Sequence, residues 1–383
     1  MKAFRLPWAG STVPRAILDV IRGCNITCDS CYNCAPESIK SLEEIESDLD
    51  FLISRRRLDA VSVIGGEVLL HPKICDIIRA IKKRGIIAEI CTNGVLINDE
   101  ILKKLKTAGI DVIFMHIELS QNRPDLPVNA TLNDLRSLCE TKAKLIAGYG
   151  IDAGLTITAG QDKFNELREL IKLTIESPHI NFILVTCHRD HSNIRVIYGD
   201  LDKGMVAKRK DSLSIDSCSR LSMKDVVPFL YNELGLKPFS YMGSNIDDKD
   251  PRWISYLVGS IIDVKGEVTS SCIKSSFFEL LFMKLSLMIK GKYPVNIKQN
   301  SSAFRLQLFF NALMGGNFFN NFKFLLKSFK DNPTIRIKKL LIQNLAEVLP
   351  DGRVIHCKEC PDAVAKKDHL VPVCICDLVD VTG

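Results

Sequence analysis

The sequence predicts an α/β fold, a partial (β/α)6 barrel followed by a helical and cysteine-rich extension. Two observations predict the barrel. Between residues 15 and 190, short apolar strands alternate six times with amphipathic helices, a pattern typical of a parallel sheet with helices outside. Connections in such a series are right-handed, which curls the sheet toward a barrel, and six units leave that barrel incompletely closed.

The expected elements of the barrel follow one another in regular order. Strands are expected at 15–22, 58–67, 86–94, 110–119, 151–160 and 181–190, and helices at 41–56, 71–85, 98–109, 130–147 and 163–177. Ser41 and Glu44 have the spacing of a capping box, which supports the start of the first helix. Gly85 ends the second helix.

The alternation of strands and helices stops after residue 190. Residues 191–250 are expected to be irregular except for a helix at 222–234, and residues 253–272 to form two strands joined at Lys265–Gly266. Residues 276–345 are expected to be helical. We therefore divide the chain into a barrel (1–195), an irregular middle segment with a β-hairpin (196–275), a basic helical module (276–348) and a cysteine-rich end (349–383).

Composition limits the class of protein. The N-terminal residues contain no signal-peptide pattern, and no window of eighteen residues is both apolar and uncharged, so we expect neither a leader nor a membrane-spanning helix. The fourteen cysteines are therefore expected in a reducing cytoplasm. In that compartment, clustered cysteines indicate metal binding or catalysis rather than disulfides.

Three cysteines directly follow the first strand. Cys24, Cys28 and Cys31 form a C-x3-C-x2-C pattern, whereas an electron-carrying 4Fe–4S site needs four thiolates. Three thiolates would leave one iron open for substrate or cofactor. Zinc is the competing interpretation, but a structural zinc site needs four ligands from two separated pairs. Cys34, three residues further on, would close the open iron, and we expect it not to be a ligand.

The position of this cysteine cluster in the predicted barrel is typical of an active site. In a TIM-type barrel, active-site groups lie on the loops after the C-terminal ends of the strands, and the cluster lies on the first such loop. The second strand ends in Gly65, Gly66 and Glu67, and the third is followed by Asn93. These residues are expected at the same rim.

Together these motifs make the chain similar to radical S-adenosylmethionine (SAM) enzymes over roughly residues 15–190. The resemblance implies that the three cysteines hold a 4Fe–4S cluster whose open iron binds SAM. An electron from a reductant such as flavodoxin or ferredoxin then cleaves SAM to a 5′-deoxyadenosyl radical, which abstracts hydrogen from the substrate. It also implies that Glu67 accepts a hydrogen bond from the SAM ammonium, and the two glycines let SAM approach closely. The family usually has an aromatic residue before its third cysteine, where this chain has Ser30, and Tyr32 is expected to replace it.

Further inward-facing residues follow from the alternation of side chains along strands. His116, Glu118 and Ser120 share one face of the fourth strand, and Thr156 lies on the fifth. Glu118 and His116 are candidates for contacts with the SAM ribose or with substrate. The alternative is that they form a satisfied buried polar pair.

A second set of cysteines lies near the end of the chain. Cys357, Cys360, Cys374 and Cys376 follow a C-x2-C-x13-C-x-C pattern, which can hold an auxiliary 4Fe–4S cluster or zinc, and we favour the cluster. Cys272 resembles the opening cysteine of a pattern known from peptide-modifying radical SAM enzymes. Cys218 has no assigned role.

The basic module suggests the substrate. Residues 276–345 contain eleven Lys or Arg, two acids and most of the eighteen phenylalanines. One helical face is expected to carry Phe318, Phe322, Leu325, Leu326 and Phe329, with Lys323, Lys327 and Lys330 opposite. This predicts a lipophilic, lipid-like substrate or contact with the membrane that holds it, although such a stripe can also simply pack on the barrel.

Other functions remain as alternatives. The runner-up is a peptide maturase with an auxiliary cluster, which the second cysteine set suggests. A non-catalytic electron-transfer protein is a third class, disfavoured by the Gly-Gly-Glu sequence and the three-cysteine spacing. Nucleic acid is not expected as a partner, because no aromatic and basic binding motif accompanies the charge.

Overall fold

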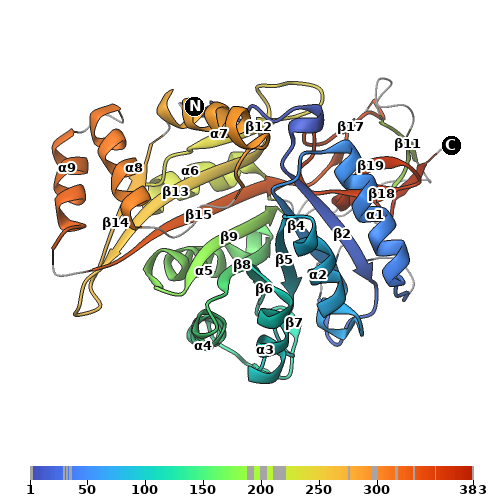
Figure 1. Ribbon diagram of the computed structural model, residues 1–383, viewed down its shortest axis with the longest axis horizontal. Coiled ribbons are helices and arrows are strands. Elements are labelled where there is room, and N and C mark those ends of the chain that lie inside the picture. The colour runs from blue at the N-terminus through green and yellow to red at the C-terminus, as the bar shows by residue number, and fades with distance from the viewer. Residues whose placement is uncertain are drawn as a thin grey trace.

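The computed structural model is built around one large twisted sheet with helices on both faces (Figure 1). It describes residues 3–28, 31, 33, 37–187, 194–198, 205–209, 221–274, 277–295, 301–314, 318–330, 333–349 and 351–381. The strands of the main sheet follow the order β1-β12-β13-β15-β9-β8-β6-β5-β4-β2, and β14 pairs with β13.

The six predicted barrel strands are confirmed and pair in parallel in chain order. They are β2 (Arg15–Ile21), β4 (Ala60–Gly65), β5 (Ile87–Thr92), β6 (Val112–His116), β8 (Asp152–Ala159) and β9 (Ile180–Cys187). The five predicted helices are α1 (Leu42–Arg55), α2 (Ile74–Lys83), α3 (Asp99–Ala108), α4 (Leu132–Gly148) and α5 (Phe164–Glu176). The partial barrel is therefore correct.

Local chemistry explains where these elements begin and which way they face. The Ser41 hydroxyl accepts a hydrogen bond from the Glu44 amide, and the Glu44 carboxylate accepts one from the Ser41 amide. The predicted capping box is therefore present at the start of α1. Along β5, Ala88 and Ile90 join the main core under the helices, while Glu89 lies on the other face of the strand.

A seventh parallel strand extends the barrel sheet. β15 (Thr334–Asn344) pairs in parallel with β9, so the prediction that residues 276–345 are helical throughout is wrong for this stretch. β13 (Pro251–Ile262) pairs antiparallel with both β15 and β14 (Val268–Ile273), which confirms the predicted hairpin. β12 (Ser240–Gly243) and β1 (Phe4–Arg5) complete the edge.

Helices cover the extended part of the sheet. α6 (Met223–Leu234) confirms the helix expected at 222–234. α7 (Phe277–Lys290), α8 (Ser301–Met314) and α9 (Phe318–Lys327) precede β15. Within the described part of the chain, no helix is both long and apolar enough to cross a membrane.

The region expected to be irregular contains strands as well as α6. β10 (Ile194–Tyr198) pairs with β11 (Met205–Arg209) and with β20 (Val379–Val381) from the end of the chain. The expectation of irregular structure is therefore wrong for these residues and for β12. The division into four segments stays a prediction, and strands from three of them share the main sheet.

The cysteine-rich end packs inside the partial barrel. It contains β16 (Glu347–Val348), β17 (Val354–Ile355), β18 (Ala363–Lys366) and β19 (His369–Pro372). Ile17 of β2 and Ile64 of β4 form a buried cluster with apolar residues of this segment. Asp362 pairs with Arg15 of β2 at 3.1 Å, and Arg15 also bonds Ser62 and Glu89. An ionic contact therefore fastens the segment to the barrel interior.

Candidate active site

The first three cysteines lie on the loop between β2 and α1. Cys24 and Cys31 are exposed and Cys28 is half-buried. A short strand, β3 (Thr27–Cys28), pairs with β7 (Gln121–Asn122), which follows β6. This pairing fastens the cysteine loop to the loop after the fourth barrel strand. Tyr32 and Cys34 lie outside the described residues, so their predicted roles stay predictions.

The three thiols are close enough to influence one another. Burial, and then the neighbouring Cys31 and Cys24, raise the pKa of the Cys28 thiol to about 11. The Asn93 side-chain amide lies 3.7 Å from the Cys24 sulfur and can donate to it. Three sulfurs on one open loop, with an amide donor beside them, fit a 4Fe–4S cluster held by three thiolates.

Among the described residues, no three His, Cys, Asp or Glu side chains are positioned to hold a single metal ion. In a 4Fe–4S cluster each thiolate binds a different iron, so the ligands need not converge on one point. The assignment of Cys24, Cys28 and Cys31 as cluster ligands therefore rests on their shared loop and donor chemistry.

The Gly65–Gly66 turn packs tightly against the backbone at the base of the cysteine loop. A Cβ atom on Gly65 would lie 2.0 Å from the Ile21 carbonyl oxygen, and one on Gly66 would lie 2.1 Å from the Gly23 oxygen. The Gly66 amide donates to Ile21 at 2.7 Å and the Glu67 amide donates to Gly23 at 2.9 Å. In this structure the two glycines make room for the base of the cysteine loop, and close approach of SAM stays a prediction.

Glu67 likewise forms hydrogen bonds with other residues of the protein. Its carboxylate is fully buried and accepts from the Leu69 amide, the Thr92 hydroxyl and the Asn93 amide at 2.7–2.9 Å. Burial raises its pKa, although these bonds act in the opposite direction. Glu67 thus ties the loop after β4 to the loop after β5, and its contact with the SAM ammonium stays a prediction.

Arg123 connects the loop after β6 to the loop after β5. Its side chain is fully buried, pairs with Asp125 and donates to the Asn93 carbonyl at 3.0 Å and to Gln121 at 2.7 Å. Sequence reasoning missed it, because an arginine in a polar loop carries no distinctive signal.

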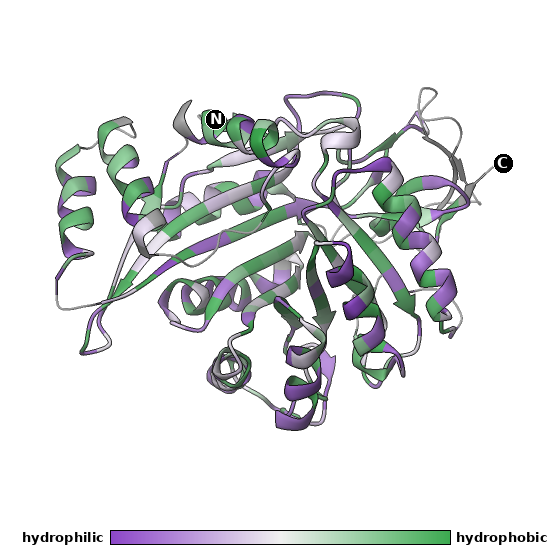
Figure 2. Cartoon of the chain, in the orientation of Figure 1, coloured by the Kyte–Doolittle hydropathy of each residue, from purple (hydrophilic) through white to green (hydrophobic). Residues whose placement is uncertain are grey.

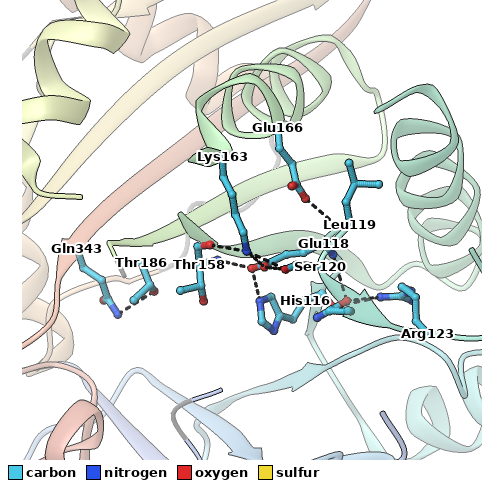
Figure 3. Close-up of polar contacts among 11 residues, drawn as sticks. His116, Glu118, Leu119, Ser120, Arg123, Thr158, Lys163, Glu166, Thr186 and Gln343 are labelled. Atoms are coloured by element: carbon cyan, nitrogen blue, oxygen red, sulfur yellow. Dashed lines mark hydrogen bonds and ion pairs between the residues drawn. The ribbon is translucent and has the colours of Figure 1, made fainter. Parts of the chain in front are cut away.

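The predicted polar face after β6 is present and forms a network with Lys163 (Figure 3). Glu118 is 2% exposed and accepts from His116 at 2.6 Å and from Lys163 at 2.9 Å, as well as from the Thr158 amide. Burial alone would raise the pKa of Glu118, but His116 and Lys163 lower it to about 2. Its oxygens are therefore occupied by the chain, and the His116 ring, 30% exposed, is the part of the network open to a ligand.

A row of polar side chains continues this face across the sheet. Thr156 pairs in register with His116, and Thr158 pairs with Thr186 on β9. Gln343 on β15 lies next in register and its amide is 3.4 Å from the Thr186 hydroxyl (Figure 3). Gln343 was missed because β15 was expected to be helical. Lys163 follows the end of β8, and that position after a strand could have indicated it.

The four cysteines at the end of the chain form a line of neighbours. Cys357 hydrogen-bonds Cys360, and this contact, followed by burial, raises the pKa of the Cys360 thiol. Burial, then Cys360 and Cys376, raise the pKa of Cys374 to about 12. The donor set suits an auxiliary iron–sulfur cluster or zinc, and the structure favours neither. Cys272 lies apart on β14 and bonds the Lys237 carbonyl, and Cys218 is outside the described residues.

Arg22 joins the two cysteine regions. It precedes the first cysteine loop and pairs with Asp19 and Asp377, the latter at 2.8 Å. Its guanidinium also reaches Asn33, within the cysteine loop, at 3.1 Å and the Cys376 sulfur at 3.9 Å. Burial raises the pKa of Asp19 to about 6 despite this pairing. One half-buried arginine therefore contacts both candidate metal regions.

A sequence model described as "Radical SAM superfamily" matches residues 18–173, which include the cysteine loop, Glu67 and Glu118. This part of the chain is therefore similar to the radical SAM superfamily. Members of this superfamily are enzymes that bind a 4Fe–4S cluster and SAM, and the cysteine loop of this chain fits that requirement.

Radical SAM relatives of several kinds match parts of the chain. A tungsten-containing aldehyde ferredoxin oxidoreductase cofactor-modifying protein of Pyrococcus furiosus is 25% identical over 171 residues, 40% of this chain and 46% of the relative. GTP 3′,8-cyclase of Chlorobaculum tepidum is 34% identical over 113 residues, 28% and 34% of the two chains. The subtilosin biosynthesis protein AlbA of Bacillus subtilis is 25% identical over 166 residues, 40% and 35%. The match spans less than half of each relative.

Solved structures show only a distant likeness. SuiB of Streptococcus suis bound to S-adenosylmethionine has a TM-score of 0.39 and 16% identity, covering 58% of this chain and 49% of that one. The enzyme anSMEcpe with bound AdoMet and a peptide has a TM-score of 0.38 and 17% identity, covering 57% of each chain.

Proposed function

We propose that this chain is a radical SAM enzyme that modifies a peptide, with Cys24, Cys28 and Cys31 holding the cluster at which SAM is cleaved. When bound, cluster and SAM supply a carbon-centred radical that removes a hydrogen atom from the substrate. The observation that carries the peptide assignment is the second cysteine set, which packs on the inner face of the barrel in a chain that is locally similar to AlbA, named as a bacteriocin biosynthesis protein.

The chain's own residues have distinct proposed tasks. His116 is oriented by Glu118 toward SAM or substrate, and Lys163 holds the Glu118 carboxylate charged from the other side. Thr156, Thr186 and Gln343 offer hydroxyl and amide groups along the same row, which suit the amides of a peptide backbone.

A lipophilic substrate is the second candidate. It is favoured by one observation: Phe318, Phe322 and Phe329 of the basic module are 44%, 38% and 61% exposed, so they are not part of the core. The comparisons include enzymes named for cofactors and a bacteriocin, and they do not support a lipid.

The test is anaerobic incubation of the reconstituted chain with SAM, dithionite and a cell extract, followed by mass spectrometry of peptides and lipids. We expect a mass change in a peptide that depends on SAM. The Cys34→Ala variant should retain this activity, because Cys34 is not expected to be a cluster ligand. A SAM-dependent change confined to lipids would overturn the peptide assignment.

The matched variant for the second site changes Cys357, Cys360, Cys374 and Cys376 together to Ala. We expect it to keep SAM cleavage, to lose peptide modification and to lose either about four irons or one zinc per chain. Unchanged metal content would refute the second metal site.

A further inference from the structure

Helices α7, α8 and α9 expose large apolar side chains on a scale not found elsewhere in the described chain. Phe319 is 84% exposed, Met288 81% and Ile289 79%, and Phe282, Phe309 and Phe318 are exposed as well. Exposed large apolar residues in the rest of the described chain are far apart in the sequence. Figure 2 shows hydrophobic residues over much of these three helices. Contiguous exposed apolar surface indicates an interaction site.

The three helices lie on the same face of the sheet. Phe304 of α8 and Phe324 of α9 share a buried cluster with Leu257 of β13, and Met283 of α7 shares another with Trp253 of the same strand. Leu257 and Trp253 are four residues apart and therefore point to the same side of β13. The opposite sides of the helices consequently face away from the sheet together, and in Figure 1 α8 and α9 lie side by side at one end of the molecule.

The exposed surface of these helices is basic. Lys284, Lys290, Lys323, Lys327 and Lys330 are all exposed. Glu279, which is the acid among the described residues between 277 and 330, is buried. A surface that combines exposed lysines with phenylalanine and aliphatic residues is complementary to an anionic, partly apolar partner.

We propose that α7–α9 form a docking face for an anionic lipid bilayer, on which the helices lie without crossing it. This goes beyond the proposed peptide chemistry and does not depend on it. Protein interfaces are depleted in lysine at their cores, whereas helices that lie on membranes combine Lys with Phe and Leu. The charge and side-chain types of this face therefore favour lipid over a protein partner. The docking would hold the barrel at a membrane surface, where a membrane-bound peptide is concentrated.

The test is sedimentation of the full-length, reconstituted chain with vesicles of phosphatidylcholine alone or mixed with phosphatidylglycerol. We expect the wild type to sediment with the mixed vesicles and far less with the neutral ones, and high salt should weaken the binding. A lysine near an anionic surface contributes about a fivefold change in affinity. Changing Lys284, Lys323 and Lys330 together to Glu should therefore weaken binding by at least about tenfold after screening. Lys327 is spared because it donates to Thr269.

Two further variants separate charge from apolar contact. Lys83, Lys103 and Lys144, exposed on α2, α3 and α4, changed together to Glu give the same change in net charge and should leave vesicle binding intact. Met288→Ser with Phe319→Ser removes two exposed side chains without opening the core, and it should weaken binding to the mixed vesicles.

Wild-type protein that ignores both kinds of vesicle overturns the proposal. So does a stable dimer, seen by light scattering, that Met288→Ser with Phe319→Ser dissociates, because a second copy then covers the face. If the Lys83, Lys103 and Lys144 control loses as much vesicle binding as the variant on α7–α9, net charge alone explains the binding, and the proposed docking face is refuted. SAM cleavage, measured in the same preparations, should be equal in all variants, and its absence from the wild type would bear on the proposed enzyme and not on docking.

Discussion

Gly66→Ala should displace the cysteine loop while leaving the barrel folded. The new Cβ would lie 2.1 Å from the Gly23 carbonyl oxygen, 2.6 Å from the Gly23 carbonyl carbon and 2.7 Å from the Arg22 oxygen. These are backbone atoms, so no side chain can rotate to relieve the overlap. The loop that begins with Cys24 must move, and the hydrogen bond from the Glu67 amide to Gly23 must lengthen or break.

The cost can be worked from these contacts. Overpacking of this kind costs about 1–3 kcal/mol. Loss of the bonds from the Gly66 and Glu67 amides adds about 1 kcal/mol each. The sum is about 3–5 kcal/mol if the loop stays in place. Because the loop lies at the surface, we expect it to shift instead, so the free energy of unfolding falls by less than this sum.

The assay is iron content after anaerobic reconstitution, combined with urea unfolding of the same protein. Gly66→Ala should lose the iron of the first site and at least about nine-tenths of SAM cleavage, since each misplaced thiolate removes one of three cluster ligands. Gly23→Ala is the matched control, because no atom lies within 4 Å of its added Cβ. Wild-type iron content and SAM cleavage in Gly66→Ala would refute the role given to the Gly-Gly turn.

Three further substitutions test contacts around the site. Glu118→Gln should lower the free energy of unfolding at pH 7 by about 3 kcal/mol, because it breaks a buried ion pair. The folded pKa of Glu118 is about 2 and its ordinary value is 4.5. The difference in free energy of unfolding between wild type and variant, measured in urea, should therefore shrink as the pH falls from 4.5 toward 2. Arg22→Gln should lower metal content at both cysteine sites and speed proteolysis of the chain end. Equal proteolysis rates in the variant and the wild type would contradict the inference that Arg22 connects the two cysteine regions. Asp362→Asn should cost about 2 kcal/mol and raise hydrogen exchange in residues 363–379, and unchanged exchange would show that Arg15 does not fasten this segment.

The barrel could be predicted from sequence because its signals are local. Hydrophobic periodicity gave the order of strands and helices, and the capping box at Ser41 gave the start of α1. The same reasoning placed the three cysteines on the loop after the first strand, where the structure has them. Glu67 and Glu118 were expected within the second and fourth strands, and the structure has them just after β4 and β6.

What sequence reasoning missed depends on distant contacts. β15 was expected to be helical because its lysines were counted with the basic module, although Ile335 and Ile337 alternate with Arg336 and Lys338 as in a strand. Lys338 is fully buried and donates to the Ser177 and Ile180 carbonyls, which no local pattern shows. Such partners are defined by the fold and not by neighbours in the chain.

The roles of Gly66 and Glu67 show the same limit within the site. A short motif predicts that these residues matter, but their partners, the Gly23 carbonyl and the Asn93 amide, belong to other loops. The motif therefore indicated the place correctly and left its local function open.

The most direct measurement of the central claim is the formation of 5′-deoxyadenosine by anaerobically reconstituted protein given SAM and dithionite. The account predicts that the wild type forms it, and that Cys24, Cys28 and Cys31 changed together to Ala abolish it with loss of about four irons per chain, while metal at the second site remains. Formation of 5′-deoxyadenosine by the triple variant, or its absence from wild-type protein that carries the full iron content, would contradict the account.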